Sequence, residues 1–303
     1  MKDRQNILVV GSEGFIGRHI CEFYKNKGHN IYKVGTSESK SENYFKVDKV
    51  NSDFNIVFSK VKFDVCINAS GSASVGYSLE DPVNDFNLNT VNVYSLLAGI
   101  KDNCPECKFV TMSSAAVYGN VTELPIKEEF KKEPLSPYGW HKLYSEQIIK
   151  EFANYFKIKT LGLRIFSVYG PGLNKQLFYD LYNKCKEAKS LELFGTGEES
   201  RDFIYIDDFI NALDLCLNKM DFNGESINVG VGKEYIISDV ARIFSSYVDE
   251  QIEVNFNGEF RKGDPQNWQA DISKLNQVGF QQSIGIKEGL KKTVEYYREN
   301  EKA

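Results

Sequence analysis

The chain has 303 residues, of which 42% are hydrophobic, so it is long enough to bury a substantial core. Its formal net charge is −5, with 42 acidic against 37 basic residues, and no basic stripe is present, which argues against a nucleic-acid partner. No apolar run approaches the length of a membrane span, and no signal-peptide core follows the charged start. We therefore expect a cytoplasmic protein with no membrane partner.

The first predicted elements are a strand, a glycine turn and a helix. Residues 6–10 form a short apolar run, G-x-x-G-x-x-G follows at 11–17, and apolar residues then recur at helical spacing up to Gly28. Glycines let the backbone approach a pyrophosphate, whose charge is favoured at a helix N-terminus. A simple tight connection is the alternative interpretation of this turn. The candidate contacts are Gly11, Gly14, Phe15, Ile16 and Gly17.

Two further predicted strands end in small or hydroxyl residues. Residues 63–68 run into Ala69, Ser70 and Gly71, where a flat cofactor can lie against the backbone. Residues 108–112 run into Ser113 and Ser114. In an open parallel sheet, ligands bind beyond the carboxyl ends of the strands, so we expect these ends and the glycine turn to converge.

A predicted helix after Ser136 carries Tyr138 and Lys142 four residues apart, on one face. A free tyrosine has a pKa of about 10, and a neighbouring cation lowers it. The pair therefore predicts a phenol prepared for proton transfer, although ordinary amphipathic helices also carry this spacing. His141 points about 100° around the helix from Lys142, and we assign it no catalytic role.

The six cysteines stand at 21, 66, 104, 107, 185 and 216. Their scatter is typical of reduced core thiols rather than a disulfide framework. Cys104 and Cys107 have ligand-like spacing but lack a second Cys or His pair, so we expect no metal.

Together with residues 117–119, 164–171 and 201–208, these motifs form an ordered set. The chain thereby resembles the extended short-chain dehydrogenases/reductases, which are NAD(P)-dependent nucleotide-sugar epimerases, dehydratases and reductases. The resemblance covers nearly the whole chain. It implies an α/β fold, a Rossmann-type doubly wound parallel sheet with a smaller, discontinuous α/β substrate-binding domain. The dinucleotide-binding domain is expected at 1–166 with returns near 205–229, and 167–303 is expected to be mainly substrate-binding.

The resemblance also implies roles for individual residues. Ser114 matches the hydroxyl residue that hydrogen-bonds the reacting substrate oxygen, and Tyr138 matches the general acid/base. Lys142 matches the lysine that binds the nicotinamide ribose and lowers the tyrosine pKa. Asn89 matches an asparagine that supports the active-site backbone and joins a proton relay.

Two positions narrow the predicted reaction. Ala115 and Ala116 stand where relatives that eliminate water carry an Asp-Glu pair, and Ala116 also replaces a cysteine used in carbon-proton transfer. Simple redox at one sugar carbon remains, most plausibly C4. Our first hypothesis is a 4-keto-6-deoxyhexose reductase using NADPH, acting on a nucleotide-diphosphate sugar. The alternatives are a sugar-nucleotide 4-epimerase of the UDP-hexose type with bound NAD and, more distantly, a non-catalytic NAD(P)-sensing protein.

Cofactor choice depends on the end of the strand at 30–34, after which an NAD enzyme usually places an acidic residue for the ribose 2′-OH. Gly35 follows instead, and Thr36, Ser37, Ser39 and Lys40 are suited to a 2′-phosphate. Glu13 and Glu38 argue for NAD. The balance favours NADP and leaves NAD open. By resemblance, Asp48 is expected to contact the adenine.

The substrate side rests on resemblance alone. Arg201 and Arg261 match arginines that hold the diphosphate, and Asp264 matches a residue near the nucleotide ribose. Ser167 stands where many relatives place a substrate-contacting asparagine. A homodimer is also expected, through the helix after Pro82 and the Tyr138 helix. Leu88, Val91, Leu96 and Leu97 fit either that interface or the core of the chain.

Overall fold

The computed structural model describes residues 4–50, 52–259, 263 and 265–301. Its contacts divide the chain into two units. The first unit comprises residues 1–119, 131–165 and 219–227, and the second comprises residues 120–130, 166–218 and 228–303. The expected domain boundary at 166 stays a prediction, because these units are defined by contacts alone.

A seven-stranded sheet forms the centre of the first unit, in the order β11-β6-β5-β4-β1-β2-β3. The strands are β1 (Asn6–Val10), β2 (Asn30–Gly35), β3 (Tyr44–Lys46), β4 (Val65–Asn68), β5 (Lys108–Ser114), β6 (Thr160–Ile165) and β11 (Asn223–Val229). The pairs from β3 to β6 are parallel. The strand order reverses between β1 and β4, which is where a doubly wound sheet binds its ligand. The predicted Rossmann-type fold class is confirmed.

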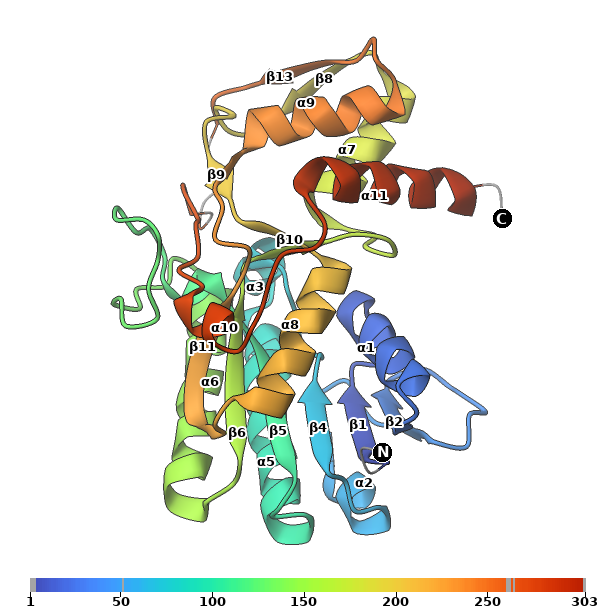
Figure 1. The fold of residues 1–303 in the computed structure, drawn as a ribbon, viewed down its shortest axis with the longest axis vertical. Helices are drawn as coiled ribbons and strands as arrows, with labels where there is room; N and C mark the ends of the chain where they lie inside the picture. Colours follow the sequence, from blue (N-terminus) through green and yellow to red (C-terminus); the bar gives the residue numbers. More distant parts are fainter. Residues whose placement is uncertain (1–3, 51, 260–262, 264, 302–303) are drawn as a thin grey trace. The chain divides into compact units, whose positions relative to one another are not determined.

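Helices cover both faces of this sheet. In Figure 1, α1 lies in front of β1 and β2, whereas α2, α5 and α6 lie behind the sheet. The helical elements are α1 (Phe15–Asn26), α2 (Asn55–Lys60), α3 (Val75–Glu80), α4 (Pro82–Phe86), a π-helical turn (Asn87–Val91), α5 (Asn92–Asn103), a 3-10 turn (Ala115–Val117) and α6 (Pro137–Phe156). Alternate residues of β1 face opposite sides, so Leu8 and Val10 pack into the core shared with α2 and α5.

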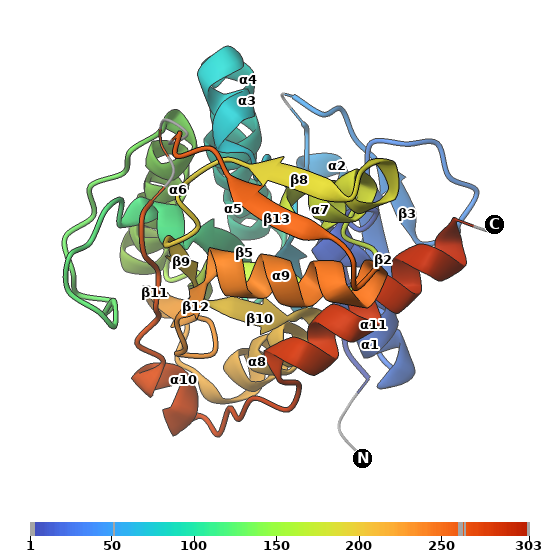
Figure 2. The same ribbon diagram turned by 90° about the horizontal axis from the view of Figure 1, so that it is seen from above.

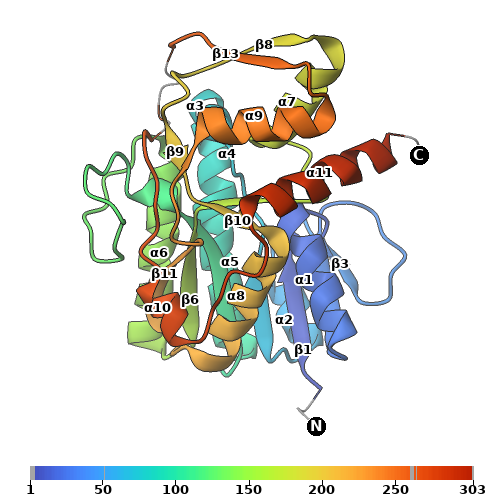
Figure 3. The same cartoon turned by 45° about the horizontal axis from the view of Figure 1, so that its top comes forward.

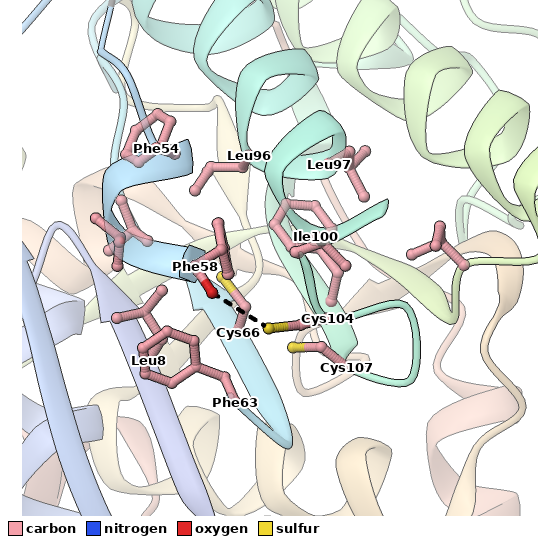
Figure 4. Packing of buried hydrophobic residues seen from close by; sticks show 14 of the residues in the cluster. Leu8, Phe54, Phe58, Phe63, Cys66, Leu96, Leu97, Ile100, Cys104 and Cys107 are labelled. Carbon is pink, nitrogen blue, oxygen red and sulfur yellow. Dashed lines mark hydrogen bonds between the residues drawn. The ribbon is translucent and has the colours of Figure 1, made fainter. Parts of the chain in front are cut away.

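That core also contains three of the six thiols. Cys66 on β4 and Cys104 and Cys107 after α5 are buried among Phe58, Phe63 and Ile100 (Figure 4). Burial raises the pKa of the Cys66 and Cys107 thiols well above the ordinary value. Among the described residues, no group of three or more His, Cys, Asp or Glu side chains is arranged to hold a metal ion.

The second unit combines short sheets with packed helices. Three two-stranded sheets pair β10 with β7, β12 with β9 and β13 with β8. The last pair, parallel and seen from above in Figure 2, lies side by side next to α9. The elements are β7 (Ser167–Tyr169), α7 (Gln176–Glu187), β8 (Ser190–Leu193), β9 (Ser200–Arg201), β10 (Phe203–Tyr205), α8 (Ile206–Lys219), β12 (Tyr235–Ile236), α9 (Ile237–Val248), β13 (Glu253–Phe256), α10 (Ser273–Gln277) and α11 (Ile286–Asn300).

An aromatic cluster and a buried carboxylate hold the second unit together. The Phe178 ring stacks on Phe244 at 5.2 Å between centroids and also contacts Tyr169 and Phe203, which joins α7, α9, β7 and β10. Helices α7 and α9 lie next to each other (Figure 3). Asp202 accepts hydrogen bonds from three backbone N–H groups in two separate segments, Val231 at 2.8 Å, Gly232 at 2.9 Å and Ala270 at 3.0 Å. In the parts of the chain that the structure describes, no helix has the length and apolar character needed to cross a bilayer.

Candidate active site

The glycine turn after β1 is packed too closely for side chains at two of its positions. Gly11 has φ +77°, and a Cβ there would lie 2.7 Å from the backbone of Ser70. A Cβ on Gly17 would overlap the carbonyl oxygen of Gly11. Gly14 begins α1, and no side chain caps the helix N-terminus. The turn thus holds backbone N–H groups beside the end of β4, in the arrangement that suits a pyrophosphate.

The end of β4 brings small residues against the helix that follows α4. Asn68 Oδ1 accepts a hydrogen bond from the Ser70 hydroxyl at 2.6 Å. At Gly71 (φ +114°), a Cβ would overlap the Asn89 side-chain oxygen and lie 3.5 Å from Lys142 Nζ. Asn89 is buried, and its amide nitrogen donates to Asp85 at 3.1 Å. Ala69, Ser70 and Gly71 therefore lie close to both the glycine turn and Lys142.

Helix α6 positions the catalytic candidates. It begins at Pro137, after Ser136 accepts a capping hydrogen bond from the Gly139 N–H at 3.2 Å. Tyr138 and Lys142 are both buried, and Lys142 Nζ lies 5.8 Å from the Tyr138 ring centroid. Nζ also donates to the Met112 carbonyl at 2.8 Å. One turn of helix and the end of β5 thus bring these two side chains together with Ser114.

The electrostatics of Tyr138 differ from the expectation. Burial raises the pKa of Tyr138 to about 12, a hydrogen bond with Ser114 lowers it, and the charge of Asp85 raises it further. Burial outweighs the neighbouring charges, since the phenolate loses its hydration when the ring is covered. The neutral form of the phenol is therefore favoured unless a further positive charge lies close to it.

One buried pair beside the site escaped the sequence analysis. His141 Nδ1 lies 2.6 Å from Asp85 Oδ2, and the Asp85 side chain has no exposed surface. The π-helical turn at Asn87–Val91 follows α4 and places Asn89 against the same carboxylate. Residues 85 and 141 lie 56 positions apart, so no local spacing marks the pair. It fixes the first turns of α4 and α6 against each other.

The remaining cofactor candidates lie after β2, after β3 and in the first turn of α1. Thr36 and Ser37 are exposed after β2, and the Ser37 carbonyl accepts a hydrogen bond from the Tyr44 hydroxyl at 2.9 Å. Asp48 is exposed after β3. Phe15 and Ile16 are half-buried in the first turn of α1. These residues belong to the same unit as Tyr138 and Lys142.

The substrate candidates belong to the second unit. Arg201 Nη1 donates to the carbonyls of Ser200 at 2.7 Å and Gln266 at 3.1 Å, and its guanidinium lies 5.2 Å from the Trp268 ring centroid. The Ser167 N–H donates to the Asp202 carbonyl at 2.9 Å. Arg261 and Asp264 lie outside the described residues.

The Rossmann-type sheet and the grouped Ser114, Tyr138 and Lys142 define an enzyme of the extended short-chain dehydrogenase/reductase class. The model of the NAD dependent epimerase/dehydratase family matches residues 7–230, and the chain belongs to this family. The family resemblance drawn from the motifs is confirmed.

Several characterised relatives are similar to the chain over nearly its whole length. A UDP-glucuronate 4-epimerase of Thermodesulfobacterium geofontis is 29% identical, over 97% of this chain and 96% of the relative. The UDP-glucuronic acid 4-epimerase of Bacillus cereus, solved with UDP-glucuronic acid and NAD, is 27% identical with a TM-score of 0.88, covering 97% of this chain and 99% of that one. The UDP-glucose 4-epimerase of Thermotoga maritima, solved with UDP-glucose, is 28% identical with the same TM-score and coverage.

These comparisons correct the first functional hypothesis. The 4-keto-6-deoxyhexose reductase is wrong, because the similar proteins are UDP-sugar 4-epimerases. The error followed from the cofactor argument, in which the lack of an acidic residue after β2 favoured NADP and hence a reductase. Ala115 and Ala116 are compatible with both reactions, since neither reaction needs an acid or a base at those positions.

Proposed function

We propose that the protein is a UDP-sugar 4-epimerase that keeps NAD bound through its catalytic cycle. The observation that carries the proposal is the grouping of Ser114, Tyr138 and Lys142 in a chain whose full-length relatives are UDP-sugar 4-epimerases. The preference for NADP has no support among these relatives, because the solved Bacillus cereus enzyme contains NAD.

The residues of the first unit fit a nicotinamide dinucleotide. The glycine turn offers backbone N–H groups to a pyrophosphate, and Gly11 packs so closely on the Ser70 backbone that any Cβ there would overlap it. Lys142 is the residue proposed to hold the nicotinamide ribose. The other proposed cofactor contacts are unchanged, namely Phe15, Ile16, Thr36, Ser37, Asp48, Ala69, Ser70 and Gly71.

The chain's own residues handle the proton of the reaction. When bound, the dinucleotide would supply the chemistry that takes a hydride from C4 of the sugar and gives it back. Tyr138 removes the proton from the C4 hydroxyl and later returns it to the same oxygen, while Ser114 hydrogen-bonds that oxygen and orients it. Burial raises the pKa of Tyr138 to about 12, so the phenolate that accepts the proton is disfavoured. A positive charge close to the phenol stabilises this phenolate, and Lys142 Nζ lies 5.8 Å from the Tyr138 ring centroid.

The diphosphate of the substrate is assigned to arginine. Arg201 is half-buried and held in place by two carbonyls, so its planar guanidinium is already oriented for phosphate recognition. Ser167, Arg261 and Asp264 keep their roles as proposed substrate contacts.

The function is tested by incubating the purified protein with UDP-glucose, UDP-glucuronate and UDP-N-acetylglucosamine in turn, without added cofactor. We expect one of them to be converted to its C4 epimer, detected by chromatography. No conversion of any UDP-sugar, with the protein folded and loaded with NAD, would refute the proposal.

We further propose a homodimer formed through α4, α5 and α6. Seven large apolar or aromatic side chains on these helices are exposed, namely Val83, Phe86, Tyr94, Trp140, Tyr144, Tyr155 and Phe156. Leu88, Leu96 and Leu97, by contrast, are buried in the core of the chain, so they do not contribute to this face. A face of this kind is typical of a protein–protein contact. Light scattering at micromolar concentration should give twice the 34.5 kDa mass, and Trp140→Glu should give the monomer mass.

A further inference from the structure

The carboxyl end of β2 lacks the side chain that usually reads the adenosine ribose. In a doubly wound sheet this position follows the glycine turn by about 20 residues, and an acidic side chain there hydrogen-bonds the ribose 2′-OH. In this chain the position is Gly35, the last residue of β2. It lies beside the glycine turn, because the Gly11 N–H donates to the neighbouring Val34 carbonyl at 2.9 Å.

A carboxylate from a different element fills the space of the missing side chain. A Cβ built on Gly35 would lie 2.5 Å from Glu13 Oε2 and 2.9 Å from Glu13 Cδ, and it would overlap the Tyr44 hydroxyl. Glu13 belongs to the glycine turn itself and is exposed to solvent. The volume that an acidic residue at position 35 would enter is thus occupied by the Glu13 carboxylate.

The Tyr44 hydroxyl lies beside this carboxylate at the end of β2. The Tyr44 hydroxyl donates to the Ser37 carbonyl at 2.9 Å. The pKa of Tyr44 is raised by burial first, and then by the charge of Glu13 and a hydrogen bond with it. The register between β2 and β3 sets this contact, since Lys33 pairs with Tyr44 in the sheet.

Ser39, one of the groups that seemed suited to a 2′-phosphate, and the nearby Lys46 already have partners. Lys46 forms an ion pair with Glu38 at 2.5 Å, and the Ser39 hydroxyl accepts a hydrogen bond from the Ser41 N–H at 3.2 Å. A phosphate monoester carries about −1.5 to −2 charges at neutral pH. Placed beside Glu13, it would meet a like charge in the position where a ribose hydroxyl would find an acceptor.

We propose that Glu13 selects NAD over NADP by accepting a hydrogen bond from the adenosine ribose 2′-OH, in the place left by Gly35. This inference rests on the proposed NAD-dependent function and deepens it. It assigns the selectivity to a residue of the first loop instead of the end of the second strand. The role of Thr36, Ser37, Ser39 and Lys40 as phosphate ligands is replaced by this assignment.

The test measures binding directly, by calorimetric titration of nucleotide-free protein with NAD and with NADP. For the wild type we expect NAD to bind at least about 10-fold more tightly, as one charge-assisted hydrogen bond allows. Glu13→Gln should weaken NAD binding by about 10-fold and narrow the ratio of the two dissociation constants. The matched control is Glu22→Gln, which removes an equal charge from an exposed position on α1 and should leave the ratio unchanged.

A second variant tests whether position matters as well as charge. In the triple variant Glu13→Ala, Gly35→Asp and Tyr44→Phe, the carboxylate moves to the end of β2, and the Glu13 carboxylate and the Tyr44 hydroxyl that a Cβ on Gly35 would overlap are both removed. We expect it to recover a preference for NAD, whereas Glu13→Ala alone should not. Equal ratios in the wild type and Glu13→Gln would overturn the assignment, as would a wild-type preference for NADP. If the protein bound neither dinucleotide, the proposed function itself would fail. If the wild type had 4-epimerase activity and Glu13→Gln kept the wild-type ratio of the NAD and NADP dissociation constants, only the role of Glu13 would be overturned.

Discussion

The Tyr138 hydroxyl is in an environment that disfavours its ionised form. It is buried, and the buried carboxylate of Asp85 adds a negative charge nearby, whereas the hydrogen bond with Ser114 acts in the opposite direction. A nearby ammonium group opposes these effects, and Lys142 Nζ, at 5.8 Å from the ring centroid, provides one. Proton transfer at this residue therefore depends on how closely a positive charge approaches the phenol oxygen.

Replacing Tyr138 by Phe removes the hydroxyl and keeps the buried ring. We expect turnover to fall by about 1000-fold, the usual contribution of a general acid/base, with the melting temperature changed little. Tyr144→Phe is the matched control, because that ring lies on the same helix and is 43% exposed. Steady-state kinetics and thermal unfolding of both variants check the prediction, and near-normal turnover in Tyr138→Phe would refute the catalytic assignment.

Asp202 is a second residue whose environment gives a measurable effect. Burial raises the pKa of Asp202 to about 6, although hydrogen bonds from backbone N–H groups lower it. In the unfolded chain an aspartate has a pKa of about 3.9. Between roughly pH 4 and pH 6 the folded state therefore binds more protons, so the free energy of unfolding falls as the pH rises through this window.

The variant Asp202→Asn should lack this pH dependence. It should be less stable than the wild type, because an amide cannot accept all three backbone hydrogen bonds. The difference in the free energy of unfolding between the wild type and Asp202→Asn should shrink by about 2 kcal/mol from pH 4 to pH 6.5. Urea unfolding at four pH values measures it. Asp271→Asn serves as the control, since the pKa of Asp271 is lowered and its stabilising effect is lost as the pH falls. A difference that stayed constant for Asp202→Asn would contradict the account.

At the scale of elements, the glycine turn shows how backbone packing fixes a binding loop. A Cβ on Gly17 would lie 2.9 Å from the Gly11 carbonyl carbon and overlap its oxygen. Neither atom can move without shifting β1 or α1, because both belong to the backbone that joins these elements.

Gly17→Ala should therefore destabilise the protein by at least about 2 kcal/mol and greatly weaken dinucleotide binding. Gly28→Ala provides the control. Gly28 also has a positive φ, +85°, but nothing lies within 4 Å of its Cβ position. Gly28→Ala should lower the free energy of unfolding by about 1 kcal/mol and leave dinucleotide binding unchanged. Chemical unfolding and calorimetric titration distinguish the two, and equal effects on binding would show that the close approach at Gly17 is unimportant.

The elements of the proposed cofactor site could be predicted because their signals are local. The glycine turn at 11–17, the small residues after β4 and the capped helix after Ser136 each appear in a short stretch of sequence. Contacts between distant segments could not be predicted. The Asp85–His141 pair depends on the packing of α4 on α6, and the placement of Glu13 at Gly35 depends on a turn meeting the end of another strand. The mistaken reductase hypothesis arose from the second of these.

At the scale of the whole molecule, the two units contain different parts of the proposed chemistry. The first unit holds the glycine turn, Ser114, Tyr138 and Lys142, and the second holds Ser167 and Arg201. The sequence alone left epimerase and reductase open, because both reactions use the same three catalytic residues. The comparisons with full-length relatives separated them.

The central claim is that the protein inverts C4 of a UDP-sugar by moving a hydride at carbon and a proton at oxygen. The most direct measurement incubates the purified protein with UDP-sugars carrying deuterium at C4, without added cofactor, and follows the products by NMR. The account predicts a C4 epimer that retains its deuterium at C4. The contradicting result is no C4 epimer from any UDP-sugar, together with consumption of NADPH in the presence of a 4-keto sugar.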